Sequence, residues 1–389
     1  PPGAENFVVG KNVAATPGKV VMRTHLAELI QYAPTTKKVY AEPILLVPAW
    51  IMKYYILDLS AHNSLIRWLV EQGHTVYCLS WRNVTREDRD LGLDDYRTQG
   101  VMAALDTIEQ IEPGHRVHAA GYCLGGTLLA IAAAAMTRAG DKRLESMTLL
   151  AAQTDFSEPG ELELFIDPSQ VHMLESGMWQ RGYLAAEQMA GAFQMLQSND
   201  LIWSRMVREY MLGERSSLID LMAWNADATR MPFRMHTEYL RRLFLRNELA
   251  TGRIMVDGHP IALQNVHMPI FAVGTERDHV APWRSVYKIH YLADSDVTFV
   301  LTNGGHNAGI VSEPGRARRH YRELARTGDE PCLSPDEWLA TAPQHEGSWW
   351  PAWQQWLARH SSAEQVTPPK FGGKAGTLGE APGEYVLQR

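Results

Sequence analysis

The sequence predicts an α/β protein in which a mostly parallel, doubly wound sheet is interrupted by one long, largely helical insertion. Short apolar runs alternate with helical stretches from about residue 40 to 155, as they do in βαβ units. This strand pattern stops over 155–265 and returns in the last third of the chain. We therefore expect a discontinuous core that closes around the insertion.

Six apolar runs are expected to form the parallel strands. They lie at 44–48, 75–80, 117–122, 147–151, 270–274 and 297–301. Helices are expected near 61–72 and 98–110. An Ala-rich segment over 124–138 is apolar nearly all round, which is typical of a buried helix. The alternation of the two kinds of segment predicts a sheet that is covered on both faces.

The predicted division into domains follows from this pattern. Residues 1–154 and 266–365 are expected to form the core, 155–265 a helical cap or lid, and 366–389 an extended C-terminal tail. The cap holds ten of the 16 methionines, whose flexible side chains suit either a surface that repacks around apolar partners or an ordinary helical core. Tryptophans recur at helical spacing over 349–356 and predict a terminal helix packed on the body.

Composition and charge argue against several classes of function. The net charge of -7 disfavours general attraction to nucleic acid or to an anionic membrane, because both contacts depend on Lys and Arg. No apolar run reaches the roughly 18 residues of a transmembrane segment. Three scattered cysteines, Cys78, Cys123 and Cys332, are too few for a disulfide framework and suit a reducing cytoplasm. The sequence begins at Pro1 without a leader, so we expect a fragment of a longer chain.

A candidate nucleophile stands where a predicted strand meets the Ala-rich helix. The string Gly-Tyr-Cys-Leu-Gly-Gly over 121–126 has the strand, sharp turn and helix that a nucleophile elbow requires. Its glycines leave room for a cramped turn and for close approach of the helix to the sheet. The helix N-terminus also favours a thiolate. We therefore predict Cys123 as the nucleophile of an α/β-hydrolase fold; the alternative is a buried, inert thiol.

An acid and a base are expected farther along the chain, since α/β-hydrolases place nucleophile, acid and histidine in that order. Asp278 follows the run 270–274, where a loop at the C-terminal end of a strand would present it to the site. His306 stands in a glycine-flanked loop beyond 297–301. Its main rival is His279, for which we expect a minor orienting role.

Acyl transfer also needs N–H donors for the developing oxyanion. We expect one from Leu124, directly after the nucleophile, and the other from Ile51, in the turn after strand 44–48. The alternative interpretation of that turn is purely structural. A cysteine exchanges one thioester for another at little cost, which indicates acyl-CoA as the substrate. The proposed chemistry needs no metal ion, and we expect no cofactor, CoA being a product carried in by the substrate.

Several further strings accompany the cysteine elbow. They are Lys53-Tyr-Tyr-Ile-Leu-Asp-Leu59 with Asn63-Ser-Leu65, Ser80-Trp-Arg-Asn83, Leu93-Asp-Asp-Tyr96, Trp224-Asn-Ala-Asp227 with Thr229 and Pro232, His236, Tyr239-Leu-Arg241, Asp278-His-Val-Ala-Pro-Trp283, Gly305-His306 and His345-Glu-Gly-Ser-Trp-Trp350. With these strings the sequence resembles the class I polyhydroxyalkanoate synthases over nearly its whole length. Two positions depart from that family's pattern: Met52, where many members have Asn, and Val84, where Pro is common.

The resemblance implies polymerisation of (R)-3-hydroxyacyl-CoA, typically 3-hydroxybutyryl-CoA, into a growing polyester chain with release of CoA. It also implies a mobile cap, a homodimer as the active form, and attachment to cytoplasmic polymer granules. His306 would deprotonate Cys123 and later a substrate hydroxyl, with Asp278 fixing its tautomer or acting directly on that hydroxyl. The alternative on the same scaffold is a cysteine hydrolase of esters or thioesters, in which water takes the acyl group.

Overall fold

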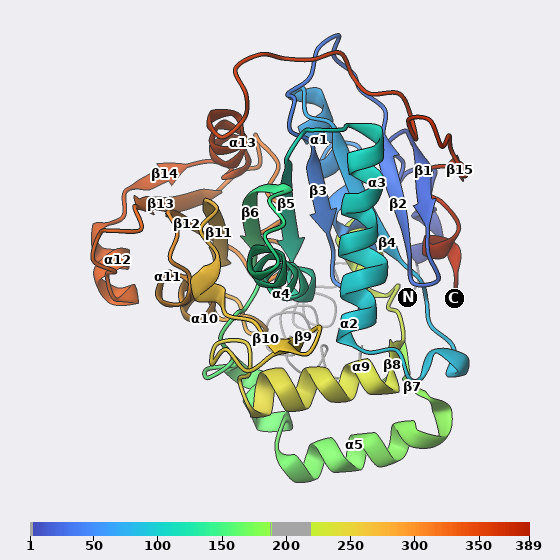
Figure 1. Ribbon diagram of the computed structural model, residues 1–389, viewed down its shortest axis with the longest axis vertical. Helices are drawn as coiled ribbons and strands as arrows, with labels where there is room; N and C mark the ends of the chain where they lie inside the picture. The colour runs from blue at the N-terminus through green and yellow to red at the C-terminus, as the bar shows by residue number, and fades with distance from the viewer. Residues whose placement is uncertain (1–2, 187, 189–218) are drawn as a thin grey trace, which may run out of the picture.

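A large twisted sheet forms the centre of the computed structural model, which describes residues 3–186, 188 and 219–389 (Figure 1). Its strands are β1 Gly18–Arg23, β2 Ala27–Tyr32, β3 Ile44–Val47, β4 Val76–Trp81, β5 Val117–Tyr122, β6 Leu144–Leu150, β11 Ile270–Thr275, β12 Val297–Thr302, β13 His320–Arg326, β14 Gln344–Glu346 and β15 Gly379–Glu380. In the described part of the chain they are ordered β14-β13-β12-β11-β6-β5-β3-β4-β2-β1-β15.

The six central strands, from β12 to β4 in this order, are parallel to one another, and each corresponds to one of the six apolar runs. Their register aligns the carboxyl ends of three neighbouring strands. Val47 of β3 pairs with Gly121 of β5, and Tyr122 pairs with Leu150 of β6. The loops that follow these strands therefore begin side by side, next to residue 123.

The outer strands β1, β2, β13, β14 and β15 pair antiparallel and are not predicted by the apolar pattern. In β2 the pattern is interrupted by Glu28 and Gln31, which are nevertheless buried. The carboxylate of Glu28 accepts hydrogen bonds from Arg23 and from the backbone N–H groups of Glu384 and Tyr385. These partners come from other parts of the chain, so a local pattern does not reveal them.

Helices cover the sheet on both sides, and α4 and α3 lie in front of it in Figure 1. Those of the predicted core are η1 Ala4–Asn6, η2 Tyr54–Asp58, α1 Leu65–Glu71, η3 Arg86–Asp88, α2 Leu93–Tyr96, η4 Arg97–Met102, α3 Ala103–Ile111, α4 Leu124–Arg138, α10 Trp283–Tyr287, α11 Ile289–Leu292, α12 Pro335–Thr341 and α13 Trp350–Arg359. The predicted helix at 124–138 is confirmed at both ends. The helix expected from 61 begins at 65, because the Ser64 side chain accepts from the N–H of Arg67 and caps it.

The predicted cap, 155–265, is described except for 187 and 189–218. Its described elements are η5 Gly160–Phe165, α5 Pro168–Arg181, β7 Tyr183–Leu184, α8 Asp220–Asn225, β8 Met231–Pro232, α9 Phe233–Glu238, the π-helix η8 Tyr239–Leu245, β9 Met255–Val256, β10 His259–Pro260 and η9 Leu263–Asn265. In Figure 1, α5 and α9 lie below the sheet. The side chain of Asn247 accepts from the N–H of Phe156 at 2.9 Å and so connects the two ends of this insertion.

The tryptophans at helical spacing do form a helix packed on the body, as predicted. All four are buried in α13 or directly before it. Three of their indole N–H groups reach into the core: Trp349 donates to the carbonyl of Gly309 at 3.0 Å, Trp350 to that of Ile310 at 2.9 Å, and Trp353 to the hydroxyl of Thr148 at 3.0 Å. The helix therefore supports the loop that follows β12.

Beyond α13 the chain crosses to the opposite edge of the sheet, where β15 pairs with β1 (Figure 1). The last turn, η10 Tyr385–Leu387, lies against the buried ammonium group of Lys53. That group donates to the carbonyls of Val386 at 2.5 Å and Gln388 at 2.6 Å. None of the helices in the described ranges combines the length and the apolar character needed to cross a membrane.

Candidate active site

The candidate nucleophile occupies a strained turn between β5 and α4. Cys123 has φ 52° and ψ -125°, a conformation that costs a non-glycine residue on the order of 1–3 kcal/mol. Its N–H is held by the carbonyl of Leu150 at 2.9 Å, and its carbonyl accepts from Gly126 and Thr127 in the first turn of α4. The strand, turn and helix thus form as the elbow motif predicts, and the strain falls on the cysteine itself.

The glycines of the elbow are required for space. A β-carbon at Gly125 would lie 2.1 Å from the carbonyl oxygen of Val47, and one at Gly121 would lie 2.3 Å from the α-carbon of Gly126. A β-carbon at Gly126 would lie 2.4 Å from that of Ala152. Each of these distances is below van der Waals contact, so the helix can approach the sheet this closely only without side chains at the three positions.

Asp278 lies beyond the end of β11, and its carboxylate is satisfied by four donors. It accepts from the N–H groups of Val280 at 2.9 Å and Ala281 at 2.8 Å, from the hydroxyl of Thr275 at 3.0 Å, and from Nδ1 of His306 at 2.7 Å. The side chain has no exposed area. Because an ionised carboxylate can only accept, the network fixes Nδ1 of His306 as a donor and leaves Nε2 for another partner.

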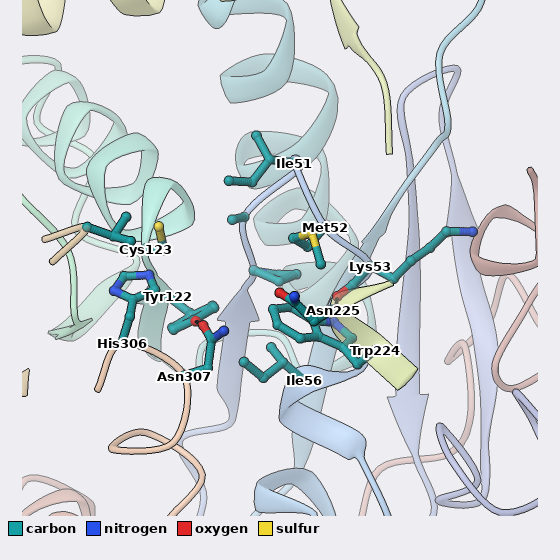
Figure 2. A pocket seen from close by; sticks show the side chains of 13 residues that line it. Ile51, Met52, Lys53, Ile56, Tyr122, Cys123, Trp224, Asn225, His306 and Asn307 are labelled. Atoms are coloured by element: carbon teal, nitrogen blue, oxygen red, sulfur yellow. Dashed lines mark hydrogen bonds between the residues drawn. The ribbon is translucent and has the colours of Figure 1, made fainter. Parts of the chain in front are cut away.

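Cys123 lines the same pocket as His306, whose ring points toward it in Figure 2. Burial by itself lowers the pKa of His306, but the negative charges of Asp278 and of the Cys123 thiolate, together with hydrogen bonds to both, raise it well above its usual value of 6.5. The site therefore favours a protonated imidazole beside the Asp278 carboxylate. The structure brings Cys123, Asp278 and His306 together, although Cys123 precedes Asp278 by 155 residues and His306 by 183 in the sequence.

A small cavity in front of Cys123 is lined by both halves of the predicted architecture. From the core come Pro48, Ala49, Ile51, Met52, Lys53, Ile56, Tyr122, Val280, His306 and Asn307, and from the predicted cap come Trp224 and Asn225 (Figure 2). Cys123 is only 8% exposed. The nucleophile is thus largely shielded from solvent, so a charge that develops beside it would be screened little by water.

The two predicted oxyanion donors come from two different parts of the core, the start of α4 and the turn after β3. Leu124 is the first residue of α4, so its N–H has no acceptor within the helix. Ile51 lines the pocket from the turn after β3. In the part of the chain that the structure describes, no protein atom accepts from the N–H of Ile51. Both groups are therefore available to a bound oxygen atom.

Two further residues of the site are absent from the sequence-based expectations. The hydroxyl of Tyr122 donates to the side-chain oxygen of Asn307 at 2.6 Å. Its ring lies 5.5 Å from that of His306, between centroids, at an angle of 37°. Tyr122 thus packs against the imidazole and restrains its loop. Only their positions in the sequence could have indicated Tyr122 and Asn307, because Tyr122 directly precedes Cys123 and Asn307 directly follows His306.

The rival His279 lies elsewhere. Its side chain is 50% exposed, and its Nδ1 lies 3.3 Å from Oε1 of Glu161. Across 3–186 and 219–389, no three His, Cys, Asp or Glu side chains gather as a metal site would require. The other two cysteines are also unlike Cys123: burial raises the pKa of Cys78 well above its usual value, and burial also raises that of the half-buried Cys332.

Comparisons with known proteins agree with this architecture. Residues 2–69 match the family described as the N-terminus of poly-beta-hydroxybutyrate polymerase (PhaC), and residues 42–313 match the alpha/beta hydrolase fold. A poly(3-hydroxyalkanoate) polymerase from Methylorubrum extorquens is 43% identical over 98% of this chain and 63% of its own length. A polymerase subunit from Rhizobium meliloti (strain 1021) is 40% identical over 98% of this chain and 62% of its own length.

The chain thus spans about 62–63% of these two relatives. A larger share is matched in poly(3-hydroxyalkanoate) polymerase 2 from Ectopseudomonas oleovorans, which is 36% identical over 98% of this chain and 68% of its own length. The expected fold and the family resemblance are both confirmed by these matches. The elbow, the buried nucleophile and the comparisons together lead to one conclusion: the chain belongs to the poly(3-hydroxyalkanoate) polymerase family and has the α/β-hydrolase fold.

Proposed function

We propose that this chain is the catalytic part of an acyltransferase that polymerises (R)-3-hydroxyacyl-CoA, in particular 3-hydroxybutyryl-CoA, into polyester. The observation that carries the proposal is the strained turn at Cys123, which places a largely buried thiol in one pocket with the His306–Asp278 pair. The names of the related polymerases give the reaction class. Cys123 is the proposed nucleophile, His306 the base and Asp278 the residue that orients it.

In the first step, His306 holds the proton of Cys123, and the thiolate attacks the carbonyl carbon of the substrate thioester. The new C–S bond places a negative charge on the carbonyl oxygen, which the N–H groups of Leu124 and Ile51 stabilise. The bond to the sulfur of CoA then breaks. His306 gives its proton to that sulfur, so CoA leaves as a thiol and the acyl group remains on Cys123.

In the second step, the hydroxyl of another 3-hydroxyacyl group or of the growing chain attacks the acyl carbon on Cys123. Neutral His306 takes the hydroxyl proton, an ester bond forms, and the C–S bond to Cys123 breaks. The four donors around Asp278 support an orienting role for this carboxylate rather than direct action on the hydroxyl. The same oxyanion donors serve both steps.

The low exposure of Cys123 favours polymerisation over the alternative hydrolase function. At 8% exposure, the acyl group on Cys123 would meet little water, so a hydroxyl delivered by the chain competes well. The proposal requires no metal ion and no cofactor besides the CoA that the substrate brings. We further propose that the protein acts as a homodimer in the cytoplasm, at the surface of polyester granules.

The test supplies (R)-3-hydroxybutyryl-CoA and measures both thiol release and insoluble polymer. Release of CoA with accumulation of polymer is expected, whereas free 3-hydroxybutyrate without polymer would establish the hydrolase instead. Cys123→Ala should abolish CoA release and leave the circular dichroism spectrum unchanged. Cys332→Ala is the matched control, because this half-buried thiol lies outside the pocket and its loss should leave the rate unchanged.

A further inference from the structure

Two of the strings that accompany the elbow in the sequence come together in space. The segment after α8, from the predicted cap, lies alongside the turn after β3, and Met52 forms an antiparallel bridge with Ala228. The turn is the one that contributes Ile51 to the pocket. A piece of the cap is therefore paired directly with the backbone of the candidate oxyanion hole.

Side chains hold the two segments together at several points. The indole N–H of Trp224 donates to the carbonyl of Lys53 at 2.7 Å, and the hydroxyl of Tyr55 donates to the carboxylate of Asp227 at 2.8 Å. Farther along, the amide of Asn63 donates to Asp220 at 2.9 Å. These bonds fix the position of the cap segment, but none of them touches the peptide unit that carries the N–H of Ile51.

Thr229 does contact that peptide unit. Its hydroxyl donates to the carbonyl of Trp50 at 2.5 Å, and its backbone N–H donates to the carbonyl of Ile51 at 3.2 Å. The residue is only 1% exposed. Thr229 thus binds the carbonyls of two successive peptide units, one of which is the Trp50–Ile51 unit.

Because a peptide unit is planar, the contact with the carbonyl of Trp50 also fixes the direction of the N–H of Ile51. The Trp50–Ile51 bond is trans, so its carbonyl and its N–H point in opposite directions. Since the carbonyl of Trp50 points toward Thr229, the N–H of Ile51 points away from the cap segment. On the other side of the turn, the indole N–H of Trp81 donates to the carbonyl of Pro48 at 2.8 Å. The turn is therefore held from the core by Trp81 and from the cap by Thr229.

We propose that Thr229 is a positioning residue for acyl transfer: its hydroxyl fixes the Trp50–Ile51 peptide so that the N–H of Ile51 is aimed at the oxyanion formed on Cys123. The oxyanion hole is then complete only while the cap segment is docked on the turn. This inference rests on the role proposed above for Ile51. The competing interpretation is that Thr229 merely ties the cap to the core.

The test compares two reactions of Cys123 in Thr229→Val, which loses the hydroxyl, and Thr229→Ser, which keeps it. In the first reaction, p-nitrophenyl butyrate acylates the thiolate; a C–S bond forms, the C–O bond to p-nitrophenolate breaks, and the carbonyl passes through an oxyanion. In the second, iodoacetamide alkylates the thiolate with loss of iodide and no oxyanion forms. Rapid mixing gives the acylation rate from the burst of p-nitrophenolate.

We expect Thr229→Val to slow acylation by about 10-fold to 100-fold, which is a somewhat smaller effect than the complete loss of an oxyanion donor would have. The rate of alkylation should stay unchanged. Thr229→Ser should acylate within about 3-fold of the unmodified protein, since it restores the donor. Thr107→Val is the matched control. Its hydroxyl also donates to a backbone carbonyl, that of Ala103 at 2.9 Å, but lies in α3, outside the pocket.

Two results would overturn the inference. Acylation of Thr229→Val at the rate of the unmodified protein would show that the hydroxyl does not position the donor. An equal loss of acylation and alkylation would indicate a purely structural role. Neither result bears on polymerisation, because the probe ester needs only the nucleophile and the oxyanion donors. An unmodified protein that shows the acylation burst but makes no polymer would contradict the proposed function alone.

Discussion

Nδ1 of His306 lies 2.7 Å from Oδ2 of Asp278, and the charge of this carboxylate helps to raise the pKa of the imidazole. Asp278→Asn would replace an acceptor by a neutral group that can donate to Nδ1. The imidazole would then favour the tautomer with its hydrogen on Nε2, the wrong one for accepting the proton of Cys123. We expect the rate of CoA release to fall by about 10²-fold to 10⁴-fold.

Single-turnover CoA release measures this effect. Asp336→Asn is the control, because Asp336 is an exposed carboxylate that pairs with Arg284 on the surface. An Asp278→Asn rate within a few-fold of the unmodified protein would contradict an orienting role.

The raised pKa of His306 makes stability depend on pH. Below about pH 6.5 the histidine is protonated in both the folded and the unfolded state, so its attraction to Asp278 contributes fully to stability. As the pH rises through the higher folded-state pKa, the folded protein loses this proton and the contribution disappears. The difference in free energy of unfolding between the unmodified protein and His306→Gln should therefore shrink as the pH rises.

Urea unfolding at several values between about pH 5.5 and pH 9.5 measures this difference. The half-exposed His279 provides the comparison, as His279→Gln should give a small difference at every pH. A difference for His306→Gln that grows with pH would have the wrong sign.

Trp349→Phe should weaken both the fold and the site. The substitution removes the hydrogen bond from the indole to the carbonyl of Gly309 and leaves a small cavity at a fully buried position. We expect a loss of about 2 kcal/mol in the free energy of unfolding. The loop that carries His306 would also be less restrained, so CoA release should slow. An unchanged midpoint of urea unfolding would mean that the helix α13 does not support this loop.

A buried and an exposed carboxylate at the same edge of the sheet should differ in their effect on stability. Glu28 is fully buried and accepts from Arg23, Glu384 and Tyr385, so Glu28→Gln would place an amide against donors and cost about 2–3 kcal/mol. Glu380 is exposed and pairs with Lys19, so Glu380→Gln should cost less than about 1 kcal/mol. Equal losses in urea unfolding would argue against the anchoring of the tail by Glu28.

The parts of the fold that were predictable from the sequence are those whose patterns are local. Strand β5 is buried over its whole length and helix α4 from Leu124 to Met136, and the elbow between them depends on six consecutive residues, so this region matches the expectation closely. Asp278 and His306 were predictable because each follows an apolar strand in a loop. Strand β2 was not, because Glu28 becomes compatible with burial only when the distant tail supplies its donors.

For the same reason, the sequence could not predict which residue supports the turn that carries the N–H of Ile51. Thr229 is 179 residues from Trp50 in sequence, and nothing around it indicates which carbonyl its hydroxyl binds. Tyr122 and Asn307 were likewise visible as neighbours of the triad, but their mutual bond depends on how two loops meet. Local chemistry predicts the reacting groups, whereas their supporting contacts require the three-dimensional structure.

The different surroundings of the three cysteines have a practical consequence for counting working molecules. Cys78 is buried in β4, and burial raises the pKa of both Cys78 and Cys332, while Cys123 lines the pocket beside His306, its proposed base. A small electrophile at neutral pH should therefore react with one thiol out of three. The amount consumed in the first rapid phase then gives the molar concentration of competent sites in a preparation, independently of any substrate or polymer.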